Sequence, residues 1–184
     1  MTAPRAIVVD ASVAVALVRR EEAASVARVA IGRWISAGRP LVVPSHFWLE
    51  VVNALFRRHR WNGQEVVNAV HELEELGLET VESGAGTRLL TIDAVERFGL
   101  SAYDALYLAV AEETDGDLAT FDAALAAAAG PRAIAIGGAS RASEAGAAYE
   151  RPVTWPRYRA IASWLATIRA RETRAAGEPD TAAR

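Results

Sequence analysis

Four acidic side chains, far apart in the sequence, stand where strands and helices are predicted to meet. Asp10 directly follows a first apolar strand, and Asp122 directly follows a later one. Glu50 lies in the second turn of one predicted helix, and Asp104 lies in the first turn of another. Because parallel strands end at the edge of the sheet where the following helices begin, all four acids are expected along one edge. We call these four residues the acidic rim.

Carboxylates gathered on one edge favour a particular chemistry. They repel one another, and without a cation their pKa values would be pushed upward. A hard divalent ion such as Mg²⁺ or Mn²⁺ prefers oxygen ligands and would relieve that repulsion. Such an ion can activate water and shield phosphate charge during in-line displacement, so the acidic rim predicts hydrolysis of phosphodiester bonds.

Each acid also has a structural interpretation. Asp10 is placed to help cap the helix that follows it, and Asp122 occupies an N-cap position. Asp104 follows Ser101 by three residues, which has the form of a capping box with Asp in place of Glu. Glu50 fits a solvated helix position with apolar neighbours. The functional interpretation is favoured only because all four are expected on one edge.

Short apolar strands that alternate with helices must position these acids. Strands are predicted at residues Ile7–Val9, 41–43, 78–81, 117–120 and 132–136. Helices are predicted at about 12–20, 22–37, 45–60 with Ser45 as the cap, 64–76, 87–98, 101–113 and 122–129. In the helix at 45–60 the expected apolar stripe is Trp48, Leu49, Val52, Leu55 and Phe56. This alternation predicts a three-layer α/β/α fold with a central parallel sheet.

The end of the chain has a different composition. Residues 137–151 are rich in Gly, Ala and Ser, which is typical of a linker. Residues 156–171 carry apolar side chains at helical spacing, surrounded by arginines. We therefore predict a nuclease-like domain at 1–136 and a linker with a helical extension at 137–184. The extension is expected to pack on this domain or on a second subunit, and the alternative is an arm that contacts RNA.

Composition restricts the other possibilities. The 184-residue chain has no cysteine, which excludes disulfides and thiolate metal sites. Its apolar segment near the N-terminus contains Asp10 and is too short to span a bilayer, so we expect a cytoplasmic protein without membrane contact. His46, His59 and His71 do not form a metalloprotease motif and are expected at the surface or in packing. All basic residues are arginines, and the net charge is −3.

Four stretches around the acidic rim resemble the motifs of the PIN-domain family, in the same order. They are Ile7-Val-Val-Asp10-Ala-Ser12, Pro44-Ser-His-Phe-Trp-Leu-Glu50-Val-Val-Asn53, Leu100-Ser-Ala-Tyr-Asp104-Ala-Leu-Tyr-Leu-Ala and Leu118-Ala-Thr120-Phe-Asp122. The resemblance covers about residues 6–136, whereas 137–184 exceed the short form of the family. Among stand-alone PIN domains of this compactness, VapC-like toxins are the commonest kind, so the resemblance points to that type of toxin.

This resemblance implies an Mg²⁺- or Mn²⁺-dependent ribonuclease in which the acidic rim forms the metal site. Ser12, Thr120 and Asn53 would be polar neighbours of that site. The resemblance also implies a small antitoxin protein as partner, with its helix in an apolar groove, and a homodimer. Two alternatives remain open from sequence alone: a PIN-type nuclease that processes RNA or cuts DNA without a toxin role, and a non-catalytic binding module with the same fold.

Overall fold

The computed structural model describes residues 4–19, 22–134 and 136, and it contains one five-stranded parallel sheet. The strands are β1 (Ile7–Val9), β2 (Leu41–Pro44), β3 (Glu79–Val81), β4 (Asp117–Ala119) and β5 (Ala133–Ile134), in the spatial order β3-β2-β1-β4-β5. The predicted parallel sheet is therefore confirmed. The side chains of β1 and β2 are all buried, whereas those of the edge strands β3 and β5 are partly or largely exposed.

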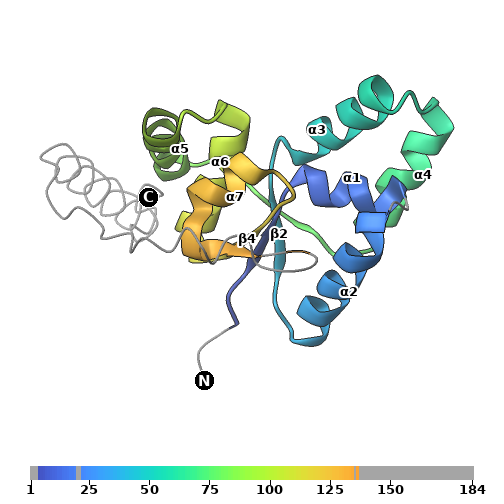
Figure 1. The fold of residues 1–184 in the computed structure, drawn as a ribbon, viewed down its shortest axis with the longest axis horizontal. Helices are drawn as coiled ribbons and strands as arrows, with labels where there is room; N and C mark the ends of the chain where they lie inside the picture. The colour runs from blue at the N-terminus through green and yellow to red at the C-terminus, as the bar shows by residue number, and fades with distance from the viewer. Residues whose placement is uncertain (1–3, 20–21, 135, 137–184) are drawn as a thin grey trace, which may run out of the picture. The chain divides into compact units, whose positions relative to one another are not determined.

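Helices cover the sheet on both faces (Figure 1). They are α1 (Ala11–Arg19), α2 (Glu22–Ser36), α3 (Phe47–Asn53), α4 (Gly63–Glu74), α5 (Ala85–Phe98), α6 (Ala102–Glu113) and α7 (Ala123–Ala129). Helices α1 and α2 lie on one side of the strands, and α6 and α7 lie on the other, which confirms the three-layer α/β/α fold. None of the helices in this described part of the chain is long and apolar enough to cross a membrane.

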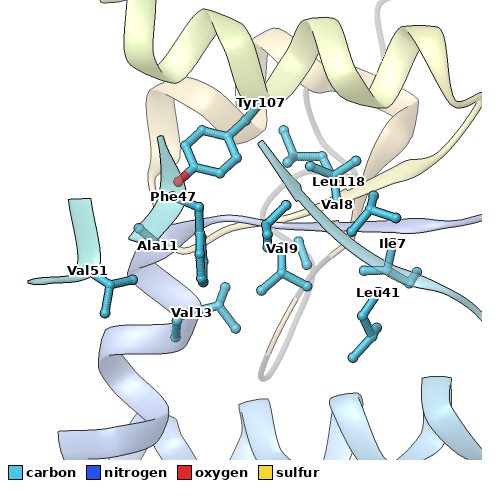
Figure 2. Packing of buried hydrophobic residues seen from close by; sticks show 14 of the residues in the cluster. Ile7, Val8, Val9, Ala11, Val13, Leu41, Phe47, Val51, Tyr107 and Leu118 are labelled. Atoms are coloured by element: carbon cyan, nitrogen blue, oxygen red, sulfur yellow. The ribbon is translucent and has the colours of Figure 1, made fainter. Parts of the chain in front are cut away.

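The core lies between these layers and explains why the strands are apolar runs. Figure 2 shows Val8 and Val9 of β1 among side chains from α1, α3 and α6. Ile7, Val8, Val9 and Leu118 are all at most 1% exposed. Burying a side chain of this size contributes on the order of 2 kcal/mol, so the central strands are held mainly by apolar burial.

The helix that carries Glu50 differs from its prediction. It begins after His46 rather than after Ser45, and it changes at Ala54 into a π-helix, η1 (Ala54–Arg58), in which the His59 amide donates to the Ala54 carbonyl at 3.2 Å. Its buried residues are Phe47, Val51 and Leu55.

The predicted apolar stripe of this helix is wrong for two of its members. Leu49 is 74% exposed and Phe56 is 43% exposed, while Trp48 and Val52 are partly buried and Leu55 is fully buried. Phe47 and Val51 are instead the residues that face Val13 of α1 (Figure 2). The buried residues Phe47, Val51 and Leu55 follow one another at intervals of four, so the helix buries a different row of side chains from the predicted stripe.

The direction of chain connection reverses between β1 and β4. From β1 the chain passes through α1 and α2 to β2 on one side, whereas β4 pairs with β1 on the other side. The Asp10 amide donates to the Ala119 carbonyl at 3.0 Å, which extends this pairing one residue beyond Val9. In open parallel sheets, ligands bind at the carboxyl ends of strands beside such a reversal.

The opposite, amino end of the same strands is held by ion pairs. Arg39 forms a short contact with Asp117 at the start of β4, and Arg5 lies 3.5 Å from the other oxygen of Asp117. Asp115 accepts from Arg132 at 3.0 Å and from Arg5 at 3.3 Å. We call this group of Arg5, Arg39, Asp115, Asp117 and Arg132 the arginine edge.

The prediction for residues 137–184, with a helix at 156–171, lies outside the described residues. The division of the chain at residue 136 remains a prediction for the same reason.

Candidate active site

Asp10 is the most buried acid of the acidic rim. It leaves the carboxyl end of β1 and is only 4% exposed. Its Oδ2 accepts a hydrogen bond from Thr120 Oγ1 at 2.7 Å and a short hydrogen bond from Ser12 Oγ. Both hydroxyls donate to the same oxygen, so Oδ1 takes part in neither of these contacts.

The two hydroxyls also fix the turn between β4 and α7. Ser12 Oγ accepts from the Phe121 amide at 3.0 Å, and Thr120 Oγ1 accepts from the Asp122 amide at 2.9 Å. Each hydroxyl thus receives a backbone proton and gives its own to Asp10. The start of α1 and the end of β4 are joined through one carboxylate.

Burial raises the pKa of Asp10 above its ordinary value, because the charged form loses water. The hydrogen bonds from Ser12 and Thr120 act in the opposite direction, and the nearby negative charge of Glu50 raises the pKa further. Its hydrogen-bond donors within the described residues, the Ser12 and Thr120 hydroxyls among them, are neutral, so they orient the carboxylate without offsetting its charge.

Glu50 stands one turn inside α3 and points towards α6. Its Oε2 accepts a hydrogen bond of 2.9 Å from the Tyr107 hydroxyl, and the same oxygen lies 3.5 Å from Nε2 of His46. The pKa of Glu50 lies below its ordinary value, chiefly because of the His46 contact and also because of Tyr107, although burial opposes both. Oε1 is outside these two contacts.

Tyr107 connects the two acids. The side chain is 0% exposed, and in Figure 2 its hydroxyl points from α6 towards the end of β1 and the start of α1. Burial raises its pKa strongly, and the negative charges of Glu50 and Asp10 raise it further. Tyr107 therefore stays a neutral hydrogen-bond donor at any physiological pH.

Asp104 and Asp122 occupy the helix starts predicted for them. Asp104 is partly buried, its amide donates to Ser101 Oγ at 3.1 Å, and its Oδ2 accepts from the same hydroxyl at 2.7 Å. Asp122 is exposed and caps α7, with Oδ1 accepting from the Leu125 amide at 2.8 Å. One oxygen of each carboxylate is outside these capping contacts.

The structure brings the acidic rim together unevenly. Asp10 and Glu50 influence each other electrostatically, and both act on Tyr107. Asp122 is linked to Asp10 through Thr120, and Asp104 lies one helical turn before Tyr107. Within residues 4–19, 22–134 and 136, no three acidic or histidine side chains are grouped closely enough to hold a metal ion by themselves.

The donor chemistry of Asp10 and Glu50 nevertheless fits a hydrated hard cation. Each carboxylate has one oxygen fixed by hydroxyl donors and one oxygen outside those contacts. Mg²⁺ is usually bound through one or two carboxylates and keeps several of its waters. A pair of carboxylates without an arginine partner is suited to such an ion.

Asn53 is the one predicted polar neighbour that lies apart from these contacts. It stands at the end of α3, one turn beyond Glu50, and its side chain is exposed.

Sequence reasoning missed two residues of this site. His46 was expected only at the surface or in packing, and Tyr107 appeared in a motif without a role. His46 packs edge-on against Tyr107, with ring centroids 4.9 Å apart. The available signal was a tyrosine in a strongly apolar helix, because a buried hydroxyl needs a hydrogen-bond partner.

Comparison with known families agrees with this geometry. The family model of the PIN domain matches residues 7–131, which is more than half of the chain and includes the whole acidic rim. The chain therefore belongs to the PIN-domain family. No curated protein sequence matches it.

Several solved structures share the fold. PAE2754 from Pyrobaculum aerophilum is 25% identical, with a TM-score of 0.50 over 67% of this chain and 79% of its own. A toxin–antitoxin complex from Klebsiella pneumoniae has a TM-score of 0.55 at 16% identity, over 72% and 98%. VapC20 from Mycobacterium tuberculosis, a toxin that cleaves the sarcin-ricin loop, has a TM-score of 0.54 at 21% identity, over 67% and 95%. The VapC type of toxin is thus among the proteins whose fold this chain shares.

Proposed function

We propose that this PIN-domain protein is a metal-dependent endoribonuclease and the toxin of a toxin–antitoxin pair. One observation carries the proposal. Asp10 and Glu50 lie at the carboxyl edge of the sheet, beside the reversal of chain connection, close enough to influence each other electrostatically, and hydroxyl groups hold one oxygen of each.

Asp10 and Glu50 are the residues that would hold Mg²⁺ or Mn²⁺. Asp104 and Asp122 complete the acidic rim, each with an oxygen outside its capping contact. Ser12 and Thr120 hold Asp10 in place, and Asn53 is a polar group one turn from Glu50. A bound ion would activate a water molecule and shield the phosphate charge during in-line displacement. Water adds to phosphorus and the 3′ oxygen leaves, which gives a 5′-phosphate and a 3′-hydroxyl.

RNA is the proposed substrate because VapC20, which shares the fold, is a toxin that cleaves an RNA loop. Within the described residues, no arginine is paired with the acids of the acidic rim. This suits a site in which a metal ion, and not a basic side chain, contacts the phosphate. A substrate of this kind places the enzyme in the cytoplasm.

The proposed partner is a small antitoxin, because the Klebsiella pneumoniae structure that shares the fold is a toxin–antitoxin complex. A pocket between α1 and α4 offers a suitable surface. The pocket is lined by the apolar residues Val18, Trp61 and Ala69 and by the polar residues Glu65, Asn68 and Glu72. An antitoxin helix with apolar and basic residues would complement this pocket. We also propose that the chain forms a homodimer.

The decisive experiment is induced expression in bacteria, followed by mapping of RNA ends. Wild-type protein should arrest growth and produce new RNA ends with a 5′-phosphate. Asp10→Asn should do neither, because it removes the negative charge of the most buried acid. Asp117→Asn is a matched control, since it makes the same change on the arginine edge and should remain toxic.

Equal toxicity of wild-type protein and Asp10→Asn would contradict the nuclease proposal. A purified chain that binds no Mn²⁺ at millimolar concentration would instead favour a non-catalytic module. The antitoxin role is tested separately by co-expression of a neighbouring small reading frame, which should restore growth and co-purify with the toxin.

A further inference from the structure

We infer that Tyr107 is the positioning residue for Glu50 and, through it, for the divalent cation of the proposed active site. This inference rests on the proposed function for its consequence, but its geometric part stands on contacts within the described residues. The hydroxyl group of Tyr107 belongs to a residue to which neither the family match nor the motifs assign a role.

Tyr107 carries a polar hydroxyl on a fully buried ring, and packing of the ring does not require this group. Tyr107 is 0% exposed, and its neighbours on α6, Leu108 and Val110, are also buried. A phenylalanine would bury the same ring at this position without a polar atom. A buried hydroxyl costs free energy unless it forms a hydrogen bond, and Tyr107 forms that bond with Oε2 of Glu50 at 2.9 Å.

Glu50 needs such a partner because its own helix fixes it poorly. It lies on α3 one turn before the π-helix η1 begins, and its side chain is 37% exposed. A glutamate side chain has several rotatable bonds, so a partly exposed one samples many conformers. A donor fixed in the core on a different helix restricts the carboxylate to one direction.

His46 makes the arrangement more rigid. Its ring packs edge-on against Tyr107 at 4.9 Å, and against the exposed Tyr103 at 5.6 Å. Its Nε2 lies 3.5 Å from the same Glu50 oxygen that Tyr107 contacts. The Tyr107 ring is thereby confined in the position from which its hydroxyl reaches Glu50.

The two oxygens of Glu50 therefore have different roles in the proposed site. Oε2 is held by Tyr107 and faces His46, which leaves Oε1 to be presented to the cation. Asp10 has the same arrangement, since Ser12 and Thr120 both hold its Oδ2. Both acids are therefore held by hydroxyl donors on one oxygen, and a cation would meet carboxylates that are already oriented.

The test is Tyr107→Phe, which deletes one oxygen atom and keeps the ring. Tyr103→Phe is the matched control, because it makes the same deletion one turn earlier on α6 at a side chain that is 67% exposed. We expect the Kd for Mn²⁺, measured by calorimetry, to rise about tenfold in Tyr107→Phe, because an unrestrained Glu50 carboxylate must be ordered when the ion binds. The kcat should fall by a similar factor, whereas KM for RNA should stay close to wild type.

A merely structural role would lower the melting temperature and leave the Mn²⁺ affinity of the folded protein unchanged, and that result would overturn the inference. A second measurement is independent of activity. In metal-free crystal structures, Glu50 should adopt one conformation in wild type and in Tyr103→Phe, and a displaced or multiple conformation in Tyr107→Phe.

These measurements separate the inference from the proposed function. If wild-type protein neither binds Mn²⁺ nor cleaves RNA, the proposed function fails, and the crystal structures still decide whether Tyr107 positions Glu50. If Glu50 keeps its conformation in Tyr107→Phe, the inference fails whatever the activity of the wild type.

Discussion

Aspartates at the amino ends of the strands and aspartates at the carboxyl ends have opposite surroundings. On the arginine edge, Asp115 and Asp117 contact Arg5, Arg39 and Arg132, and the Arg132 hydrogen bond together with the charge of Arg5 holds the pKa of Asp115 below its ordinary value. On the opposite edge, Asp10 is held by two hydroxyls, and burial raises its pKa. Both sets of acids flank the same strands, β1 and β4.

The contrast shows what a counter-charge does to an acid. The carboxylates of the arginine edge are neutralised within the protein, so they contribute to stability and have little affinity for an external cation. Asp10 is oriented by the hydroxyls of Ser12 and Thr120, which carry no charge, whereas Glu50 lies beside His46, so the negative charge that a cation would offset at this edge is chiefly that of Asp10. Such a site lowers the free energy of unfolding of the metal-free protein, and binding of a cation raises it again.

The largest expected effect is on catalysis. Asp10→Asn should lower the rate of RNA cleavage about a thousandfold, because a metal ion supplies several kcal/mol of charge stabilisation and each ~1.4 kcal/mol is tenfold. Asp117→Asn should stay within about twofold of wild type, since rate constants follow the barrier height. The measurement is cleavage of a labelled RNA at saturating Mn²⁺. Similar losses of cleavage rate in the two variants would contradict the proposal that only the acidic rim takes part in catalysis.

The second expected effect is stabilisation by metal. At a Mn²⁺ concentration of about a hundred times its Kd, the free energy of unfolding should rise by about 2.7 kcal/mol, because the ion binds only the folded chain. Chemical denaturation with and without Mn²⁺ measures this difference. Wild-type protein and Asp117→Asn should show it, whereas Asp10→Asn should not, and a chelator should abolish it. Stabilisation of Asp10→Asn by the same amount would place the ion elsewhere.

The third effect is on stability without metal, where the order of the variants should reverse. Asp117→Asn should lose about 2 kcal/mol, because a hydrogen bond to a charged group contributes ~1.5–3 kcal/mol and Arg39 would keep only its bonds to the Arg5 and Ala6 carbonyls. Asp10→Asn should be at least as stable as wild type at pH 7, since it removes a buried charge. Denaturant unfolding at low ionic strength measures both, and a destabilised Asp10→Asn would contradict the account of its raised pKa.

The smallest effect is a pH dependence. Asp10 is protonated in both states below the unfolded-state pKa of about 3.9. As the pH rises above that value, the unfolded chain loses the proton first, and the native chain keeps it up to its raised pKa. The free energy of unfolding of wild type relative to Asp10→Asn should therefore fall with rising pH in that interval, by at most ~1.4 kcal/mol per pH unit. A difference that rises with pH would mean that the pKa of Asp10 is lowered by folding.

Much of the fold could be predicted from the sequence because its strands are short runs of β-branched residues. Ile7–Val9 is confirmed to the residue, and predicted strand 117–120 loses only Thr120, whose hydroxyl bonds to Asp10. Helix starts were also readable where a side chain caps, as at Ser101 and Asp122. The predicted capping contacts of Asp104 and Asp122 are present, although Asp104 accepts from the Ser101 hydroxyl rather than its amide.

The remaining features depend on contacts between distant segments. The π-helix at Ala54–Arg58 follows from backbone bonding that no residue type signals, and which row of α3 side chains is buried depends on packing against α1. Tyr107 and Glu50 are 57 residues apart, and their hydrogen bond requires α3 and α6 to converge. Sequence pattern places each acid at an edge of the sheet, but it does not give the lateral distances along that edge.

The pairing of β1 with β4 has a consequence for the order in which the protein is made. Asp10 leaves the ribosome early, whereas Thr120 and the Phe121 amide, which complete its hydrogen bonds, follow more than a hundred residues later. A nascent chain that has not yet reached β4 carries the acid without the groups that orient it. In the proposed nuclease, the groups that orient Asp10 are therefore complete only once β4 and the turn after it have been synthesised.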